Sequence, residues 1–473
     1  MKRALFPAMG GAALVFFLAA PVLAENVSHP KAALQTIRGH EEPAFENALA
    51  PRGSDGAPKG KSPVVAGSAT APANRVTLAS DTVDWVFGAV NFKTTEAVNY
   101  NQVFINGGTV NKRVVGGIHQ LANGDTGAEH NSVVIRGASV SSVVGGNAES
   151  RKTGHAAAIG NTVDAQAGTT DEGFVLLGGT ATSGQGHATA TGNAVVLRAG
   201  KGMAIVGGMV HSRGGNATAN GNTVEILGGV VHGVQGLGVI GGYGENNGGG
   251  SMTADGNTVV VVDGSSTGSI VGGGAYQRDN GKASASNNVV DIRGGTIGGT
   301  VSGGDTGGEA GAAVAMNNTV RISGTPKFDR MLLLRGGVVN AAANEIEHPP
   351  AYNRAASNGN TLHMESAGLP VYELGWFQKL TFRLPATLKS GDTVLTVTKA
   401  YLDTNTEIEV TAPGLPVQTG DTFILIDASR EGSALTGTVA AASLSGTLNG
   451  HAYTIEPSKT QLALKIGAPA TPP

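Results

Sequence analysis

The feature that most constrains this fold is a repeat: an asparagine followed by alternating apolar residues recurs nine times, at intervals of 29 to 42 residues. A second marker, an apolar residue followed by two glycines, recurs in phase with the first, as at Val115-Gly116-Gly117. Two markers that share one period indicate a stacked array of similar units. The repeated asparagines are Asn101, Asn131, Asn161, Asn193, Asn222, Asn257, Asn288, Asn318 and Asn360.

The pattern after each asparagine predicts a β-strand with one buried side. The second and fourth residues after all nine asparagines are apolar, from Val103 and Ile105 to Leu362 and Met364. The residue between them varies freely in size and charge. Successive side chains of a strand point to opposite faces, so a constant face that alternates with a variable one indicates a strand and not a helix.

Strands that recur in this way can lie parallel and in register, about 4.8 Å apart. The sequence therefore predicts an all-β fold, a single-stranded right-handed parallel β-helix (β-solenoid) with a C-terminal β cap. The paired glycines are expected at its turns, because glycine accepts positive φ and a close approach of the backbone. Glycine makes up 74 of the 473 residues and aromatic residues only 4%, a composition that fits a thin core.

The N-terminus has the features of a secretory signal peptide over residues 1–24. Lys2 and Arg3 give a positive start, an apolar run follows, and small residues end at Ala24. The alternative is a membrane anchor, but the apolar run is short and is interrupted by Pro21. No later stretch approaches the roughly 18 apolar residues that a spanning helix needs, so we expect no membrane-spanning segment in the mature chain.

Four further segments follow the signal peptide. Residues 25–80 are rich in Ala, Pro, Gly and Ser and are expected to form a flexible leader. Residues 81–370 hold the β-helix repeats of about 30 residues. Residues 371–466 contain longer strands and are expected to form a C-terminal β cap, because an open last turn exposes unpaired backbone. Residues 467–473 are a tail.

The net charge and the cysteine content exclude several kinds of partner and reactive site. The net charge of −3 predicts no general attraction to nucleic acid or to anionic membranes. The chain has no cysteine, so it has no disulfide, no thiol nucleophile and no thiolate metal site.

The order of these parts resembles the passenger region of autotransporters, the type V secreted proteins of Gram-negative bacteria. The resemblance rests on units such as Gly-Asn-Thr-Val-Glu-Ile-Leu-Gly-Gly at 221–229 and on the strand Leu-Thr-Phe-Arg-Leu-Pro-Ala-Thr at 380–387. It covers nearly everything after residue 81. It implies a surface-exposed β-helix, often adhesive, in which the segment before the membrane anchor assists folding.

One departure from that family concerns anchoring. Autotransporters end in a membrane β-barrel, whereas this sequence ends at Pro473 with no room for one. We therefore expect this chain to lack the translocator barrel, with a separate outer-membrane translocator as one route to export. The expected location is the cell surface, the extracellular space or the periplasm. The expected partners are a host glycan or protein, or neighbouring cells.

We predict no catalytic residue, no cofactor-binding residue and no metal ligand. The segment 236–241 matches the dinucleotide fingerprint G-x-G-x-x-G, but no helix pattern follows it to receive a pyrophosphate. The segment 59–62 is similar to a phosphate loop, but the first required glycine falls on Asp55. Scattered acids such as Asp305 and Glu309 do not make a calcium cage.

The charged residues and histidines of the repeats are interpreted as surface groups. Asp291 and Arg321 share one outward column on adjacent turns and are expected to form a surface ion pair. Two histidines, His155 and His187, occupy similar places in their units, but they do not supply three ligands at a known metal spacing. Solvated loop histidines are therefore expected. The column also contains Asp164 and Glu225, and the other histidines considered are His119, His130, His211 and His232.

Two interpretations of the asparagine column stay open, a ladder of stacked amides and a simple preference for turn geometry. For the whole chain we predict a structural or adhesive surface protein and not an enzyme. The alternative is a β-helical carbohydrate-active enzyme, a polysaccharide lyase or glycosidase, which needs carboxylates that converge on one face. A passive passenger without a ligand is a third hypothesis.

Overall fold

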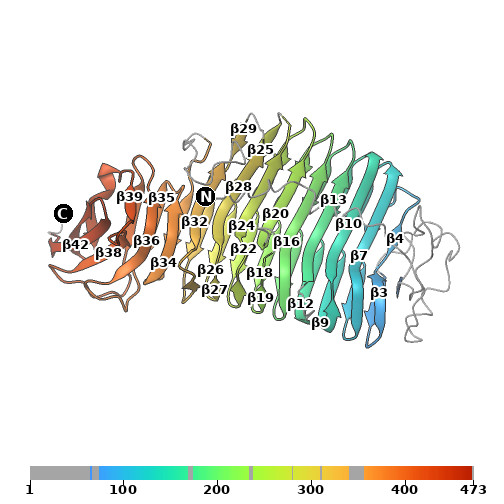
Figure 1. Cartoon of the computed structure of the whole chain (residues 1–473), viewed down its shortest axis with the longest axis horizontal. Coiled ribbons are helices and arrows are strands. Elements are labelled where there is room, and N and C mark those ends of the chain that lie inside the picture. The colour runs from blue at the N-terminus through green and yellow to red at the C-terminus, as the bar shows by residue number, and fades with distance from the viewer. Residues whose placement is uncertain are drawn as a thin grey trace, which may run out of the picture.

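The computed structural model describes residues 64–65, 74–168, 174–233, 238–279, 281–308, 312–339 and 356–470. The predicted signal peptide and most of the leader lie outside these residues. The predicted fold class is confirmed, since the chain is all-β, 61% strand, and forms a parallel β-solenoid of about 11 turns. Figure 1 shows the turns stacked along the long axis of the molecule. The right-handed coiling stays a prediction.

A typical turn has three strands, each stacked on its equivalents in neighbouring turns. The asparagine strands follow the nine repeated asparagines: β6 (Gln102–Ile105), β9 (Ser132–Val140), β12 (Thr162–Gly168), β15 (Ala194–Leu197), β18 (Thr223–Ile226), β22 (Thr258–Val261), β26 (Val289–Ile292), β30 (Thr319–Ile322) and β33 (Thr361–Met364). Three further strands extend the same parallel stack and are counted with them: β2 (Arg75–Leu78), β35 (Lys379–Arg383) and β37 (Glu407–Thr411). The long strands come next along the chain: β3 (Thr82–Phe87), β7 (Thr109–Asn123), β10 (Ser142–Thr153), β13 (Phe174–Ser183), β16 (Lys201–Ser212), β20 (Val239–Asn246), β24 (Ile270–Gln277), β28 (Thr300–Gly308), β32 (Leu333–Val339), β34 (Leu369–Gly375), β36 (Thr393–Tyr401) and β38 (Thr422–Asp427).

The alanine strands complete the turn: β5 (Val98–Asn99), β8 (Thr126–Glu129), β11 (Ala156–Ile159), β14 (Ala188–Thr191), β17 (Ala217–Thr218), β21 (Met252–Thr253), β25 (Lys282–Ser284) and β29 (Ala312–Val314). Short strands extend the long-strand sheet: β1 (Val64–Val65), β4 (Val90–Asn91), β19 (Val230–Val231), β23 (Ser265–Ser266), β27 (Thr296–Ile297), β31 (Lys327–Phe328) and β39 (Ala434–Thr436). The described residues contain one helix, the 3-10 turn η1 (Ala441–Ser443), and no helix among them is long and apolar enough to cross a membrane.

The asparagine strands keep the register that the repeat predicts. Val163 pairs with Val133 on one side and with Val195 on the other. All eighteen apolar positions predicted to face inward, from Val103 to Met364, are at most 2% exposed. The inward columns of Val, Ile and Leu therefore form one continuous core, and a second, smaller core consists mainly of alanine from the alanine strands.

The paired glycines correct one expectation. They lie inside the long strands and not at turns, as Gly116 and Gly117 do in β7. They do not have positive φ, so conformational freedom is not why glycine is required there. A Cβ on Gly146 would overlap the carboxamide of Asn161, and one on Gly145 would overlap the backbone carbonyl of Gly178 in the next turn. Close approach of the backbone is the physical reason, as the sequence also indicated.

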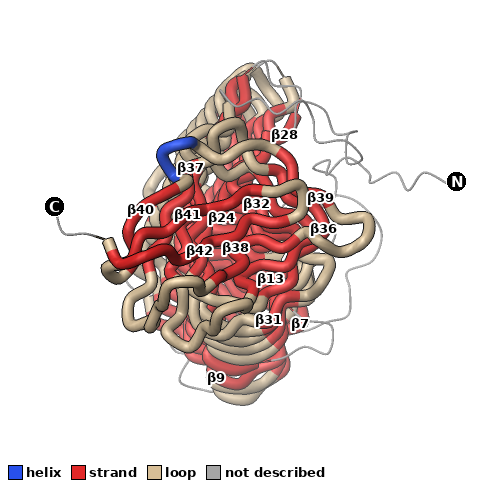
Figure 2. Tube along the Cα trace, turned by 90° about the vertical axis from the view of Figure 1, so that its left-hand side faces the viewer, coloured by secondary structure: helices blue, strands red, loops and turns tan. Residues whose placement is uncertain are grey.

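The C-terminal part begins with more parallel turns and then changes direction. Strands β34, β36 and β38 continue the parallel stack. Strand β42 (Gln461–Pro469) then lies antiparallel to both β38 and β41 (His451–Pro457), and β40 (Ser445–Leu448) pairs antiparallel with β41. Figure 2 shows these strands crossing the end of the solenoid. Apolar residues such as Leu462 and Leu464 join the main core, so the hairpin covers its last turn.

Candidate functional site

The asparagine column forms a continuous hydrogen-bonded ladder through the interior. The Nδ2 and the backbone N–H of Asn131 both donate to Oδ1 of Asn161, each at 3.0 Å. The same pair of bonds links successive asparagines from Asn101 to Asn360. The ladder continues at Gln378, whose Oε1 accepts from the backbone N–H of Asn360 at 2.8 Å. Of the two interpretations left open, the structure supports the ladder, which is structural because its asparagines are at most 1% exposed.

The outer face of the long strands carries a further apolar cluster, whose residues are buried, each at most 8% exposed. On either side of the glycine pairs, outward residues pack together, such as Val115 and Ile118 of β7 and Ile240 and Tyr243 of β20. This outer cluster extends from Trp85 in β3 to Val271 in β24. In the Val271 column the next two residues are Ser302 and Arg335, so the outer face turns polar at β28.

A tyrosine–carboxylate cluster lies at this change from apolar to polar. It consists of Tyr243 and Glu245 of β20, Tyr276 of β24 and Asp305 of β28. The hydroxyl of Tyr243 donates to Glu245 Oε1 at 2.9 Å, and that of Tyr276 donates to Asp305 Oδ2 at 3.2 Å. The two tyrosine rings lie 5.4 Å apart. Three consecutive turns thus bring two carboxyl groups and two aromatic rings to one place.

The carboxyl groups of this cluster are poorly hydrated. Burial raises the pKa of Asp305 to about 6, against a smaller opposing effect of the Arg335 charge and the Tyr276 hydrogen bond. Burial also raises the pKa of Glu245, while the hydrogen bond from Tyr243 and the charge of Arg278 oppose that shift. Within the described part of the chain, Glu245 Oε2 and Asp305 Oδ1 accept no hydrogen bond. Each carboxyl group therefore has an acceptor oxygen without a donor.

His211 adjoins the cluster on the preceding long strand, where it pairs with Glu245. Burial lowers the pKa of His211 to about 4, helped by the charges of Arg213 and Arg278. Its ring is therefore neutral at physiological pH. Its Nε2 is buried and has no hydrogen-bond partner among the described residues.

We did not predict this cluster from the sequence, although a signal for it was present. Tyr243 is the first residue after its glycine pair and Glu245 the third, and Tyr276 holds the third position in the next unit. Aligning the units on the glycine pairs places Glu245 beside Tyr276, as the structure does. The alternation that identifies the asparagine strands predicts nothing about the outer face of the long strands, where this cluster lies.

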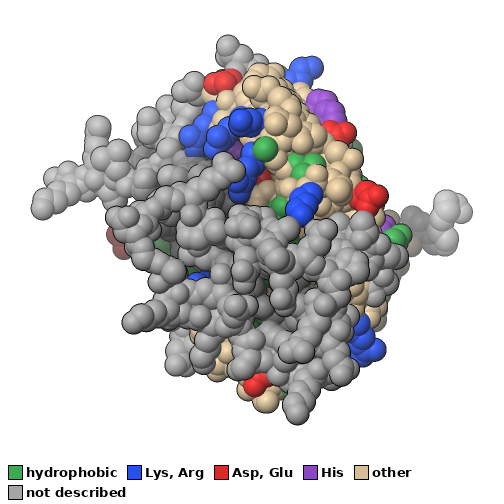
Figure 3. Space-filling model, turned by 90° about the vertical axis from the view of Figure 1, so that its right-hand side faces the viewer, with side chains coloured by type: hydrophobic (Ala, Val, Ile, Leu, Met, Phe, Trp, Pro, Cys, Tyr) green, Lys and Arg blue, Asp and Glu red, His purple; other side chains and the backbone are tan. Residues whose placement is uncertain are grey.

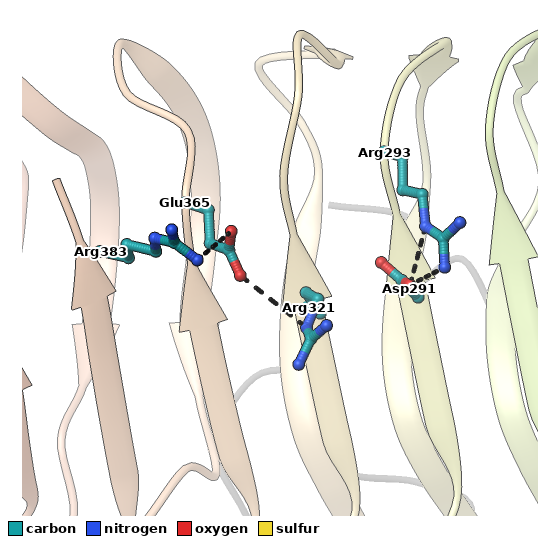
Figure 4. A network of polar contacts seen from close by, with 5 residues as sticks. All are labelled: Asp291, Arg293, Arg321, Glu365 and Arg383. Carbon is teal, nitrogen blue, oxygen red and sulfur yellow. Dashed lines mark hydrogen bonds and ion pairs between the residues drawn. The ribbon is translucent and has the colours of Figure 1, made fainter. Parts of the chain in front are cut away.

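The predicted ion pair between Asp291 and Arg321 is not formed. The two residues do pair in register on adjacent asparagine strands. Asp291 instead binds Arg293, at 2.7 Å between Oδ2 and Nη2. Arg321 lies 4.0 Å from Glu365, whose other oxygen is 3.8 Å from Arg383 (Figure 4). Asp291 and Arg321 each have another partner within reach, so they do not pair with each other. Asp164, in the same column, pairs with Arg198 at 2.9 Å.

The histidines have structural contacts. The rings of His155 and His187 stack at 4.8 Å, and Nδ1 of each accepts a backbone N–H from the next turn at 2.9 Å. These two are hydrogen-bonded parts of the stack and not simply solvated loop residues. His119 is fully buried, and burial lowers its pKa. In the described ranges no three His, Asp or Glu side chains are grouped so as to hold a metal ion.

Some segments and residues that the sequence had already excluded as binding motifs fall partly or wholly outside the described residues. These are the segment 59–62, the first two residues of the segment 236–241, and Glu309. At the N-terminal end of the solenoid, the part left visible in Figure 3 has both acidic and basic side chains. A scan against protein-family models and searches of the curated proteins and of the solved structures found no match to the chain.

Proposed function

We propose that this chain is an exported, surface-displayed β-solenoid of the autotransporter passenger type, which binds ligands and catalyses no reaction. The observation that carries the proposal is the parallel stack of about 11 turns, which repeats outward positions at a fixed spacing and so offers a long face to an extended partner. The signal-peptide pattern of residues 1–24 supports export. The resemblance in repeat style and order of parts supports the surface location.

Binding of the full chain to immobilised mucin, matrix proteins and host cells tests this proposal. We expect saturable binding of the folded chain to at least one of these surfaces, and no saturable binding of a heat-unfolded sample from which aggregates have been removed. Absence of saturable binding to every surface would contradict an adhesive function.

A carbohydrate-active enzyme is the second candidate function. The observation in its favour is the pair of carboxyl groups with raised pKa, Glu245 and Asp305, because a protonated carboxyl group is the general acid of glycoside hydrolysis. Release of reducing ends or unsaturated products from a polysaccharide panel tests it. Activity that is lost in Asp305→Asn would support the enzyme, and no release from any polysaccharide would reject it.

A further inference from the structure

The long strands from β3 to β24 have buried residues on both faces. Strand β20 shows this most clearly, because all of its residues are buried. Val239 belongs to the main core, whereas Ile240 and Tyr243 belong to the outer cluster on the opposite face. If nothing covered the outer cluster, it would form a contiguous apolar patch in contact with water. Its burial therefore indicates a cover over the outer face.

The strands that the structure describes do not supply this cover. The members of the outer cluster and the apolar residues packed against it all belong to the long strands, to β4 or to the adjoining Phe92. The strands that β20 contacts most extensively are β16 and β24, which lie beside it in the sheet, and strands of the asparagine and alanine sheets, which lie across the core. None of these strands lies over the outer face of β20.

Buried polar atoms on the same face also lack partners. Thr182 pairs in register with His211, and His211 with Glu245, so the three form one outward row on β13, β16 and β20. Among the described residues, Thr182 Oγ1, His211 Nε2 and Glu245 Oε2 have no hydrogen bond, and neither does Trp85 Nε1 in β3. Trp85 can only donate and ionised Glu245 can only accept, so the cover must offer both kinds of group. A polypeptide backbone does so.

The chain enters the solenoid beside the outer cluster. Strand β1 pairs with β3 at Val86 and Phe87, and Phe87 is a member of the cluster. Residues 25–63 lie between the predicted signal peptide and β1. At the usual strand spacing the long strands from β3 to β24, seen side by side in Figure 1, span roughly 30 Å, which about nine extended residues cross. Residues 25–63 are therefore long enough to cover the whole cluster.

We propose that residues 34–49 of the leader dock on the outer cluster, and that residues 50–63 form the tether that leads from them to β1. The docking segment contains the large apolar residues of this part of the leader, which are Leu34, Ile37, Phe45 and Leu49. The tether consists of Ala, Pro, Gly, Ser and charged residues, a composition typical of a flexible linker. Because the segment is covalently attached, its effective concentration at the face is high.

Hydrogen exchange of the full chain, followed by peptide mass spectrometry, tests this docking. After correction for intrinsic rates, peptides of residues 34–49 are expected to exchange at least about tenfold more slowly than peptides of residues 50–63. Phe45→Asp combined with Leu49→Asp places two charges against the outer cluster, so the segment is expected to lose this protection. The same variant is expected to bind more of a hydrophobic dye such as ANS, because the cluster has lost its cover.

A matched control variant carries the same two added charges in the tether. Ser54→Asp combined with Ala57→Asp is expected to exchange and to bind the dye like the unchanged protein, and circular dichroism checks that both variants are folded. Unprotected residues 34–49 in the unchanged protein would overturn the docking, and a dimer in sedimentation would then assign the cover to a second copy of the chain. Protection that survives the changes at Phe45 and Leu49 would overturn the anchoring by apolar side chains.

Discussion

At the scale of single residues, Asp305 makes the stability of the fold depend on pH. Its folded pKa of about 6 is above the ordinary value of 3.8, so the folded state binds this proton more tightly than the unfolded state. The resulting stabilisation is complete below about pH 4 and is lost as the pH rises through 6. With partial solvent screening, the loss is about 1 to 3 kcal/mol.

Asp305→Asn is therefore expected to stabilise the protein at pH 8 by about 1 to 3 kcal/mol and to have little effect at pH 4, because asparagine cannot ionise and its Oδ1 can still accept from Tyr276. Urea unfolding of both proteins at the two pH values measures the difference. Both proteins contain the other titrating groups, such as Glu245 and His211, so the contribution of these groups cancels in the difference between the two unfolding free energies. A variant that is less stable than the unchanged protein at pH 8 would contradict the assignment.

The ladder gives a second prediction for a single residue. Asn193→Asp keeps the shape of the side chain but removes the Nδ2–H that donates to Asn222 Oδ1 at 3.0 Å, and it buries a carboxylate beside that oxygen. We expect a loss of more than about 3 kcal/mol in the free energy of unfolding, because an unpaired buried charge faces an acceptor. Asn358→Asp is the control, since Asn358 is exposed and its side-chain oxygen accepts from Gly359. If urea unfolding gave equal losses of unfolding free energy for the two variants, the ladder would contribute nothing to stability.

At the scale of strands, the glycine pairs allow the long strands to approach the ladder. Gly146→Ala places a methyl group against the carboxamide of Asn161, and we expect a destabilisation of about 2 kcal/mol or more from overpacking. A Cβ on Gly249 would meet no atom within 4 Å, and this glycine has no positive φ, so Gly249→Ala is expected to change stability by less than about 0.5 kcal/mol. Thermal unfolding of the two variants provides the measurement. Similar midpoints would show that the strand can move away from the ladder at little cost.

The strands also show how much of the structure can be predicted from the sequence. The asparagine strands were predicted in phase and register, because Val103 and its equivalents repeat a period of two that only a half-buried strand needs. The predicted position of the glycine pairs was wrong. Glycine is required both at turns and where two parts of the backbone approach closely, and the glycine pattern alone does not separate these two cases. The position of Asn161 across the core separates them. The tyrosine–carboxylate cluster was missed because Tyr243, Tyr276 and Asp305 become neighbours only when the long strands are stacked, and their own spacing matches no motif.

At the scale of the whole molecule, each turn contacts mainly its neighbours. The free energy of unfolding is therefore close to a sum of contributions from the single turns and from the interfaces between them. A defect in one turn should therefore unfold a neighbourhood and leave distant turns intact. Asn193 lies near the middle of the ladder, between Asn161 and Asn222, whereas β36 and β42 belong to the C-terminal part, with its large buried side chains such as Phe423.

Hydrogen exchange of Asn193→Asp followed by peptide mass spectrometry tests this expectation. The strands β12, β15 and β18 around the substitution are expected to exchange at least about tenfold faster than in the unchanged protein, the factor for about 1.4 kcal/mol of local stability. Strands β36 and β42 are expected to keep their protection, because the antiparallel hairpin and its core residues do not depend on the ladder at Asn193. The control Asn358→Asp should leave both groups unchanged. If every strand of Asn193→Asp loses protection together, the solenoid unfolds as one cooperative unit and the turn-by-turn account of its stability is wrong.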